Sequence, residues 1–276
     1  MHSSLVDVGW LGRNFGDPNL IVLDASPISN MANLKVLHPG LRIIGARPFN
    51  LKDHFSNKQI DLPNMMPSSE AFTKASQSLG INTESKLVIY DNLGLYSAPR
   101  AWWMLTVMGH KNVAVLDGGL NDWISAGGAT EPISEEVYTP GNFVSRFDSG
   151  KVKTAKQVRQ NIESKEFVVV DARSSGRFHA KVPEPRAGSR RGHIPESYNL
   201  PYTKLLDGGK LRPKQQLEAL FDALDLGEAP LVFTCGSGMT AAINLLAATL
   251  VLENELGLYD GSWSEWGAAD GVWPIR

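Results

Sequence analysis

The stretch LVFTCGSGMTAA, residues 231–242, holds Cys235, the one cysteine of the chain. Apolar residues lead into Cys235, a loop with two glycines follows, and an apolar segment typical of a helix comes next. Glycines allow the backbone N–H groups of such a loop to converge, and the helix N-terminus favours negative charge at the same point. A thiol placed there ionises more readily than a free one, so the pattern predicts a thiolate nucleophile in an anion-binding loop. The predicted active-site loop comprises Gly236, Ser237, Gly238, Met239 and Thr240.

Other interpretations fit the same residues. Most free cysteines are buried as small apolar residues, but core packing alone does not require two glycines at the end of a strand. The letters GSGMTA also match the dinucleotide-binding pattern G-x-G-x-x-A, with Asp260 as a ribose-binding carboxylate. That pattern belongs to the first strand of its sheet, whereas this strand lies well inside its domain. A cysteine phosphatase would need an arginine to grip phosphate where this chain has Ala241.

The chain contains two copies of one pattern, offset by about 145 residues. The matching pairs are LIVLDAS (20–26) with FVVVDAR (167–173), IIGARPFN (43–50) with HIPESYNLPY (193–202), KLVIYD (86–91) with PLVFTC (230–235), and VLDGGLNDW (115–123) with LYDGSWSEW (258–266). Two homologous domains are the economical explanation. Asp91 then takes the place of Cys235 in the first domain, so only the second carries the nucleophile.

Short β-branched runs such as IVLDA and VVVDA alternate with apolar segments as wide as buried helices. This alternation predicts an α/β fold in which each domain has a mainly parallel sheet with helices on both faces. We expect a non-catalytic domain at 1–130, a proline- and glycine-punctuated linker at 131–150 and a catalytic domain at 151–276. Ligands of such sheets bind beyond the carboxyl ends of the strands, which is where Cys235 is expected.

Composition excludes several classes of protein. The 276 residues are 20% charged with a formal net charge of −2, whereas nucleic-acid and anionic-membrane surfaces need clustered excess base, so neither is an expected partner. One cysteine cannot form an intramolecular disulfide or a cysteine-built zinc site, and no metal or cofactor is predicted. The N-terminus lacks a secretion-signal pattern, and the run AAINLLAATLVL is too short to span a bilayer. The expected location is the cytoplasm.

The chain resembles a two-domain sulfurtransferase of the rhodanese superfamily. The motifs that carry the resemblance cover nearly the whole chain in family order: YSAPRAWWM, DGGLNDW, VVDAR, GRF, EPR, RGHIPESYNLPY, CGSGMTAA and YDGSWSEWG. The loop CGSGMT is most similar to that of 3-mercaptopyruvate sulfurtransferases, where CGSGVT is usual, whereas thiosulfate-specific relatives carry basic residues there. The fold implied is two tandem rhodanese-like domains.

The resemblance implies a persulfide mechanism. Cys235 would attack the sulfur of 3-mercaptopyruvate, release pyruvate and pass the outer sulfur to a thiol or, in the test tube, to cyanide. Because the chain has no second cysteine, an external acceptor such as thioredoxin or a small thiol is implied.

Arginine is the expected partner for the carboxylate of this substrate. The resemblance assigns substrate binding to Arg177 in GRF and Arg186 in EPR, and implies that Tyr96 in LYSAPR reaches the site from the first domain. Arg173 is expected to be structural, and Arg190 and Arg191 to shape the entrance at most.

The resemblance also places Ser237, as a second catalytic residue, in a serine–histidine–aspartate relay. The family histidine, in HIPGA, corresponds to Arg42, so a complete relay is not expected, and Ser237 would act by a hydrogen bond to the sulfur or to the substrate carbonyl. Thr240 is expected to cap the following helix, and His193 to begin a turn. The tryptophans are expected in the packing of the domains.

Sulfur transfer from 3-mercaptopyruvate is thus the leading hypothesis, and two alternatives stay open. A thiosulfate-preferring sulfurtransferase would want basic groups in the loop, and Gly236 and Ser237 supply none. A sulfur-carrier or redox module would use Cys235 without turnover, but it would not need the carboxylate clamp expected from Arg177 and Arg186.

Overall fold

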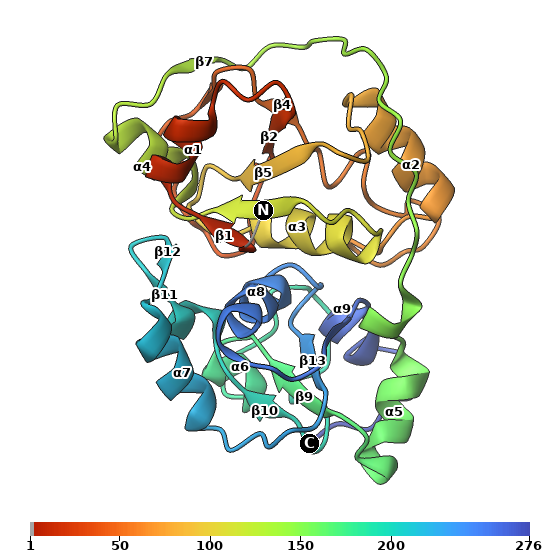
Figure 1. Cartoon of the computed structure of the whole chain (residues 1–276). Coiled ribbons are helices and arrows are strands. Elements are labelled where there is room, and N and C mark those ends of the chain that lie inside the picture. The colour runs from red at the N-terminus through yellow and green to blue at the C-terminus, as the bar shows by residue number, and fades with distance from the viewer. Residues whose placement is uncertain (1–2) are drawn as a thin grey trace. The chain divides into compact units, whose positions relative to one another are not determined.

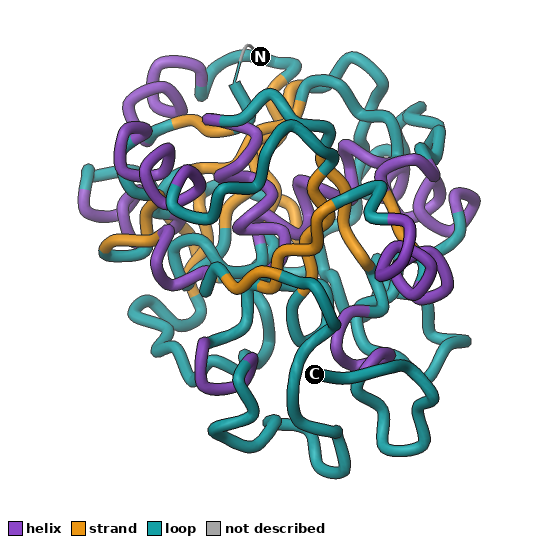
Figure 2. Tube along the Cα trace, turned by 90° about the horizontal axis from the view of Figure 1, so that it is seen from below, coloured by secondary structure: helices purple, strands orange, loops and turns teal. Residues whose placement is uncertain are grey.

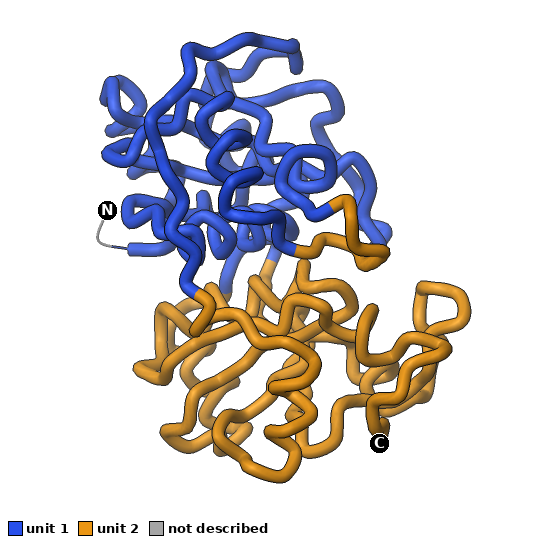
Figure 3. Tube along the Cα trace, turned by 90° about the vertical axis from the view of Figure 1, so that its right-hand side faces the viewer, with its two compact units in different colours: residues 1–57, 66–148, 208–211 blue, residues 58–65, 149–207, 212–276 orange. Residues whose placement is uncertain are grey.

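A computed structural model describes residues 3–276, and the chain forms two compact units (Figure 3). Unit 1 comprises residues 1–57, 66–148 and 208–211, and unit 2 comprises residues 58–65, 149–207 and 212–276. The short segment 58–65 therefore belongs to unit 2 although both of its neighbours in sequence belong to unit 1.

Unit 1 is built on a five-stranded parallel sheet of order β1-β6-β5-β2-β4 (Figure 1). Its elements are β1 (Leu5–Val6), α1 (Val8–Asn14), β2 (Leu20–Asp24), β3 (Leu41–Ile43), β4 (Arg47–Pro48), α2 (Ser69–Ser78), β5 (Lys86–Tyr90), α3 (Ala98–Val107), β6 (Val113–Leu116), α4 (Gly119–Ser125) and β7 (Thr130–Pro132). Strands β3 and β7 form a separate antiparallel pair.

Unit 2 has a second five-stranded parallel sheet, of order β10-β9-β13-β14-β8. The remaining elements of the chain are the 3-10 helix η1 (Ser149–Lys151), β8 (Val152–Lys153), α5 (Ala155–Ser164), β9 (Val168–Asp171), α6 (Ser175–Phe178), β10 (Tyr198–Asn199), the 3-10 helix η2 (Tyr202–Leu205), β11 (Leu206–Asp207), β12 (Lys210–Leu211), α7 (Lys214–Asp222), β13 (Leu231–Thr234), α8 (Ala241–Val251), β14 (Leu256–Tyr259) and α9 (Ser262–Trp266). Figure 2 distinguishes these helices and strands from the loops that join them.

The two sheets repeat one topology, as the internal repeat of the sequence predicts. The equivalent strands are β2 with β9, β5 with β13, β6 with β14, β1 with β8 and β4 with β10. Strands β5 and β13 are central in their sheets, and Asp91 and Cys235 are the residues that follow them. The predicted α/β fold of two domains with parallel sheets is confirmed.

The helices cover both faces of the unit 2 sheet. Alternate side chains of a strand point to opposite faces, so Val169 and Val232 lie on one face and their neighbours on the other. The first face packs in one apolar cluster with α5 and with Trp263 and Trp266 of α9. On the other face α8 packs against β13 and β14, and α7 packs against α8.

The local sequence explains where the helices begin and how deeply they are buried. Thr154 and Gln157 form a capping box that starts α5 after the short strand β8. Nearly all residues of α3 and most residues of α8 are buried, which agrees with the apolar runs AWWMLTVMG and AAINLLAATLVL. Among residues 3–276 no helix is long and apolar enough to cross a membrane.

The sequence predicts a linker at residues 131–150, but most of this segment packs on unit 1. Phe143 is 2% exposed, and its N–H donates to the carbonyl of Ile81 at 3.1 Å. Strand β7 at the start of this segment pairs with β3, and the N–H of Asp148 near its end donates to the carbonyl of Val107. Buried contacts and backbone hydrogen bonds thus attach the segment to unit 1 as far as Asp148.

Candidate active site

Cys235 lies at the carboxyl end of the central strand β13, where the sequence predicts it. Its backbone N–H lies 3.3 Å from Ser262 Oγ, and its carbonyl accepts from the N–H of Trp263 at 2.9 Å. The residue is 1% exposed, beneath a loop in which Gly236, Ser237, Met239 and Thr240 are partly exposed. The first residues of α9 therefore hold the backbone of the nucleophile, and the side chain of Cys235 is closed off from solvent.

The glycines of the loop have two different uses. Gly238 has a φ of +74°, a left-handed conformation that glycine adopts without steric cost. Gly236 instead allows a close approach, because a Cβ built on it would lie 3.0 Å from Nη2 of Arg177. The carbonyl of Gly236 also accepts from the N–H and Oγ of Ser264, at 2.8 and 2.7 Å. The loop is thus held by hydrogen bonds from α9 and lies against the Arg177 guanidinium.

The equivalent position in unit 1 is held by Asp91, whose side chain accepts several backbone hydrogen bonds. Asp91 follows β5 as Cys235 follows β13, and its carbonyl accepts from Leu120 as that of Cys235 accepts from Trp263. The Oδ2 of Asp91 accepts from three consecutive backbone N–H groups, those of Tyr96, Ser97 and Ala98, each at 2.8 Å. These amides lie at the N-terminus of α3, so at this end of the sheet three N–H groups converge on one oxygen, the arrangement that the sequence argument expects around Cys235.

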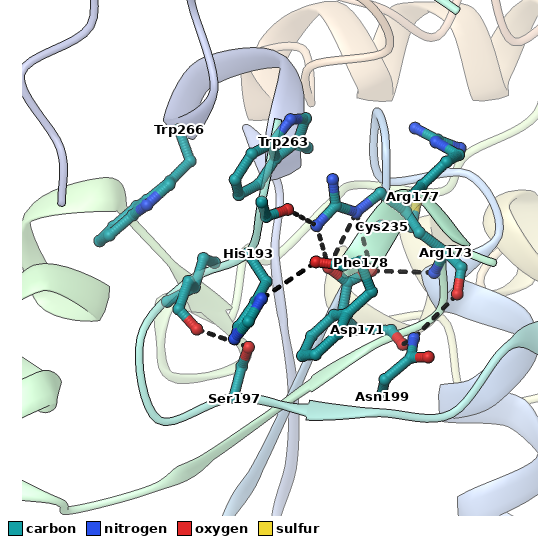
Figure 4. Close-up of polar contacts among 12 residues, drawn as sticks. Asp171, Arg173, Arg177, Phe178, His193, Ser197, Asn199, Cys235, Trp263 and Trp266 are labelled. Atoms are coloured by element: carbon teal, nitrogen blue, oxygen red, sulfur yellow. Dashed lines mark hydrogen bonds and ion pairs between the residues drawn. The ribbon is translucent and has the colours of Figure 1, made fainter. Parts of the chain in front are cut away.

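Arg177 belongs to a network of ion pairs centred on Glu184. Figure 4 shows Arg173, the second arginine of this network, with its other partner Asp171. Nη2 of Arg177 donates to Glu184 Oε2 at 2.5 Å, and Arg173 Nη1 donates to Oε1 at 2.9 Å. The side chain of Glu184 is 4% exposed, whereas that of Arg177 is 24% exposed. Arg173 is fully buried, pairs with Asp171 and lies 4.0 Å above the ring of Trp263, so it has the structural place expected of it.

Arg186 is an exposed residue that lines a cavity of about 670 Å³. The lining residues are Ile60, Asp61, Leu62, Pro63, Arg186, Ala187, Gly188, Ser189, Ser264, Ala268, Ala269 and Asp270. Ser264 connects this cavity to the loop, since it is also the residue that donates to Gly236. Arg177 therefore lies directly against the loop, whereas Arg186 is linked to it only through the cavity and Ser264.

Ser237 is hydrogen-bonded to Asn64, a residue that the sequence reasoning did not identify. Nδ2 of Asn64 lies 3.0 Å from Ser237 Oγ and 3.1 Å from the Ser237 carbonyl oxygen. Asn64 lies in segment 58–65, which belongs to unit 2 although it comes from the first half of the chain. The segment has no periodic pattern, so the sequence carries no signal for this contact.

Arg42 in β3 is tied within unit 1 to β7 and to the residues that follow β7. It is 2% exposed, its Nε donates to Glu131 at 2.8 Å, and it also pairs with Glu136. Its Nη2 donates to Ser134 Oγ at 3.0 Å. These contacts give Arg42 a structural function, that of fixing the segment after β7 against β3.

Tyr202 is a second residue that the sequence reasoning missed. Burial raises the pKa of Tyr202, the charge of Cys235 raises it further, and Arg177 opposes the shift. The phenol thus shares the electrostatic environment of the nucleophile and stays protonated at neutral pH. Tyr202 closes the motif HIPESYNLPY, which is the signal that could have drawn attention to it.

Three further sequence predictions concern residues near the loop. Thr240 precedes α8, but its backbone is helical and its side chain makes no capping hydrogen bond, so the predicted cap is wrong. His193 has a structural place, since its Nδ1 lies 3.0 Å from the Phe178 carbonyl and its ring stacks on that of Phe178. Arg190 donates to the carbonyls of Trp266, Ala268 and Trp273 and so anchors the C-terminal segment.

Tyr96 lies in unit 1, where it is 7% exposed and where its N–H is one of the donors to Asp91. Its predicted reach toward the loop stays a prediction. Within residues 3–276 no group of three or more histidine, cysteine or acidic side chains is arranged to hold a metal ion.

Comparisons with known proteins agree with this geometry. The rhodanese-like domain family matches residues 7–126 and 154–269. The chain is 39% identical to the 3-mercaptopyruvate sulfurtransferase of Escherichia coli strain K12 over 271 residues, which cover 95% of this chain and 94% of the relative. It is 37% identical to the thiosulfate sulfurtransferase of Bos taurus over 282 residues, covering 96% of this chain and 92% of the relative. The crystal structure of the 3-mercaptopyruvate sulfotransferase SseA from Escherichia coli superposes with a TM-score of 0.81, at 36% identity, covering 95% of this chain and all (100%) of that chain.

Proposed function

This chain belongs to the rhodanese family of sulfurtransferases, and we propose that it transfers sulfur from 3-mercaptopyruvate to an external thiol by way of a persulfide on Cys235. The observation that carries the proposal is the position of Cys235, at the end of the central strand and equivalent to that of Asp91. Because the amides at that position bind a carboxylate in unit 1, the same architecture suits a thiolate and then a persulfide anion in unit 2.

The first half-reaction moves one sulfur atom. The Cys235 thiolate attacks the sulfur of 3-mercaptopyruvate, the S–S bond forms, and the C–S bond breaks. Its electron pair passes into the ketone as an enolate, which takes the thiol proton to give pyruvate and leaves an anionic persulfide. In the second half-reaction an acceptor thiolate attacks the outer sulfur, carries it away and restores the Cys235 thiolate.

The positive groups near the loop suit this donor. Arg177 lies against Gly236 with its fork held by Glu184, and Arg186 lies in the neighbouring cavity beside Ser264. We propose that these two arginines bind the carboxylate and ketone oxygens of 3-mercaptopyruvate. Ser237 donates a hydrogen bond to the ketone oxygen, where negative charge builds up as the C–S bond breaks.

The acceptor is proposed to be a separate molecule, either a small thiol or a thiol protein such as thioredoxin. Cys235 is the one cysteine of the chain, so no second thiol of the same chain can remove the outer sulfur. The cavity of about 670 Å³ has room for a small thiol after pyruvate has left.

Thiosulfate is a second candidate donor because of Arg177. The loop residues carry no positive charge, but the guanidinium adjacent to Gly236 supplies one from outside the loop. A relative of similar identity, from Bos taurus, is named a thiosulfate sulfurtransferase. A dianion without a carbon skeleton would use Arg177 but would not need Arg186.

The test is intact mass measurement after brief exposure to 3-mercaptopyruvate, together with pyruvate release. The expected result is one added sulfur that peptide mapping places on Cys235, and loss of both signals in Cys235→Ser. A carrier without turnover would load sulfur from a generic persulfide but release no pyruvate. If kcat/KM for thiosulfate clearly exceeds that for 3-mercaptopyruvate, the donor assignment is wrong.

A further inference from the structure

Asn64 presents its amide nitrogen to Ser237, and the geometry settles which end of the amide does so. The atom assigned as Nδ2 lies 3.1 Å from the Ser237 carbonyl oxygen and 3.0 Å from Oγ. A carbonyl oxygen only accepts hydrogen bonds, so the group facing it is the NH₂ and not the amide oxygen. The same NH₂ group therefore donates to Ser237 Oγ.

This contact fixes the polarity of the Ser237 hydroxyl. A hydroxyl oxygen has one hydrogen and two lone pairs, and Asn64 uses one of the lone pairs. The hydroxyl hydrogen is then directed away from Asn64. An amide does not exchange protons as an acid or base near neutral pH, so Asn64 cannot take the proton of Ser237 either.

We infer that Asn64 is a positioning residue that makes Ser237 a hydrogen-bond donor toward the group reacting at Cys235, and that Ser237 does not act as a base. The inference rests on the proposed function, because the ketone oxygen of 3-mercaptopyruvate is where that donor is needed. Ser237 is two residues from Cys235, in a loop whose backbone is held at Gly236 by α9. The position of Ser237 is thus fixed by the loop, and the direction of its hydroxyl hydrogen is fixed by Asn64.

The backbone at position 64 decides which variants are informative. Asn64 has a φ of +60°, a left-handed conformation that asparagine, aspartate and glycine tolerate better than other residues. Asn64→Gly therefore removes the side chain without straining the backbone. Asn64→Asp keeps the shape and the backbone preference but replaces the donor with an acceptor.

The experiment is a double-mutant cycle on kcat/KM for 3-mercaptopyruvate, with Asn64→Asp and Asn64→Gly each made in the native chain and in Ser237→Ala. We expect about a 30-fold loss for Asn64→Asp in the native chain and about tenfold for Asn64→Gly. In the Ser237→Ala background both losses are expected to shrink to about threefold or less, because the hydroxyl that Asn64 orients is gone. Equal losses in the two backgrounds would mean that Asn64 only holds the loop and would overturn the inference.

The pH dependence of activity is a second measurement, which would not change in the Asn64 variants if Asn64 had a purely structural role. The activity of Asn64→Asp relative to the native protein is expected to rise as the pH falls from 7 to 5, because the protonated carboxyl regains a donor. The relative activity of Asn64→Gly is expected to stay flat, and a flat ratio for both variants would contradict the inference. The native protein is assayed first for pyruvate release, so a failure of the proposed function is seen before any variant is compared. Thermal unfolding confirms that each variant is folded.

Discussion

Arg177 and Glu184 form a forked ion pair, in which Nη2 and Nε of the arginine both donate to Oε2, at 2.5 and 3.1 Å. Glu184 is almost fully buried and is shared with Arg173, so the carboxylate cannot swing away to follow a mobile partner. The guanidinium is thereby fixed where a Cβ on Gly236 would lie 3.0 Å from Nη2. The positive charge beside the loop is therefore oriented by the planar guanidinium of Arg177, which can make two hydrogen bonds to Glu184 at once.

Arg177→Lys keeps the charge but removes the fork, because an ammonium group cannot make the paired hydrogen bonds of a guanidinium. We expect kcat/KM for 3-mercaptopyruvate to fall by about tenfold or more, and that for thiosulfate to fall less. Steady-state kinetics with both donors measure this. The matched control is Arg191→Lys at an exposed position, and a similar loss in the control would refute a specific function for Arg177.

Gly236→Ala is expected to impair catalysis without unfolding the protein. The new methyl group would press on Nη2 of Arg177 and not on backbone, so the guanidinium is pushed out of its geometry with Glu184 while the fold is retained. A rise of about tenfold in KM for 3-mercaptopyruvate with an unchanged melting temperature is the expected pattern. Gly238→Ala provides the contrast, because at a φ of +74° it should cost about 1 kcal/mol of stability. The interpretation fails if Gly236→Ala lowers the melting temperature as much as Gly238→Ala does.

Asp91→Asn tests the anion site of unit 1. Three N–H groups converge on one buried carboxylate oxygen, and hydrogen bonds to a charged acceptor are stronger than those to a neutral one. We expect a loss of about 2–3 kcal/mol in the free energy of unfolding by urea. The control is Asp222→Asn, at an exposed position at the end of α7, which should change stability little. An unchanged unfolding midpoint in Asp91→Asn would show that the amides do not favour negative charge.

His110 should make stability depend on pH. The ring is 3% exposed and packs 5.1 Å from that of Phe143, and burial lowers the pKa of His110. The unfolded chain binds a proton at this residue near pH 6.5 while the folded chain does not, so this contribution to stability is complete above about pH 6.5 and is lost as the pH falls toward the folded pKa. Unfolding by urea between pH 7.5 and 5 measures the slope.

The variant for this prediction is His110→Gln, which keeps a donor toward the Asn82 carbonyl but does not titrate. Its unfolding free energy is expected to fall less with decreasing pH than that of the native protein. His54→Gln makes the same substitution at an exposed position and serves as the matched control. If the unfolding free energy depends on pH equally in all three proteins, His110 does not cause the loss of stability in acid.

The sequence was sufficient for the features that depend on local pattern. The β-branched runs around Val22 and Val169 become inner parallel strands, and Cys235 follows a strand and precedes an apolar helix, as its neighbours predict. Repetition of the pattern predicted two equivalent sheets, because homologous segments adopt the same fold.

Contacts between distant segments could not be predicted in this way. Asn64 is 173 positions away from Ser237, and nothing in its surroundings marks it as a hydrogen-bond partner. Arg42 was compared with a catalytic histidine by its place in a motif, but its actual partners, Glu131 and Glu136, lie 89 and 94 positions further along. Thr240 was expected to cap α8 from residue type alone, whereas its helical backbone keeps its hydroxyl from forming the cap.

The assignment of segment 58–65 to unit 2 has an architectural consequence. A fragment starting at Ser149 would keep the nucleophile and its sheet but would lose one wall of the cavity and the amide that orients Ser237. The half of the chain that lacks a thiol therefore contributes part of the site that surrounds the thiol of the other half. Truncation or gene fission between the repeats would separate the nucleophile from residues of its own pocket.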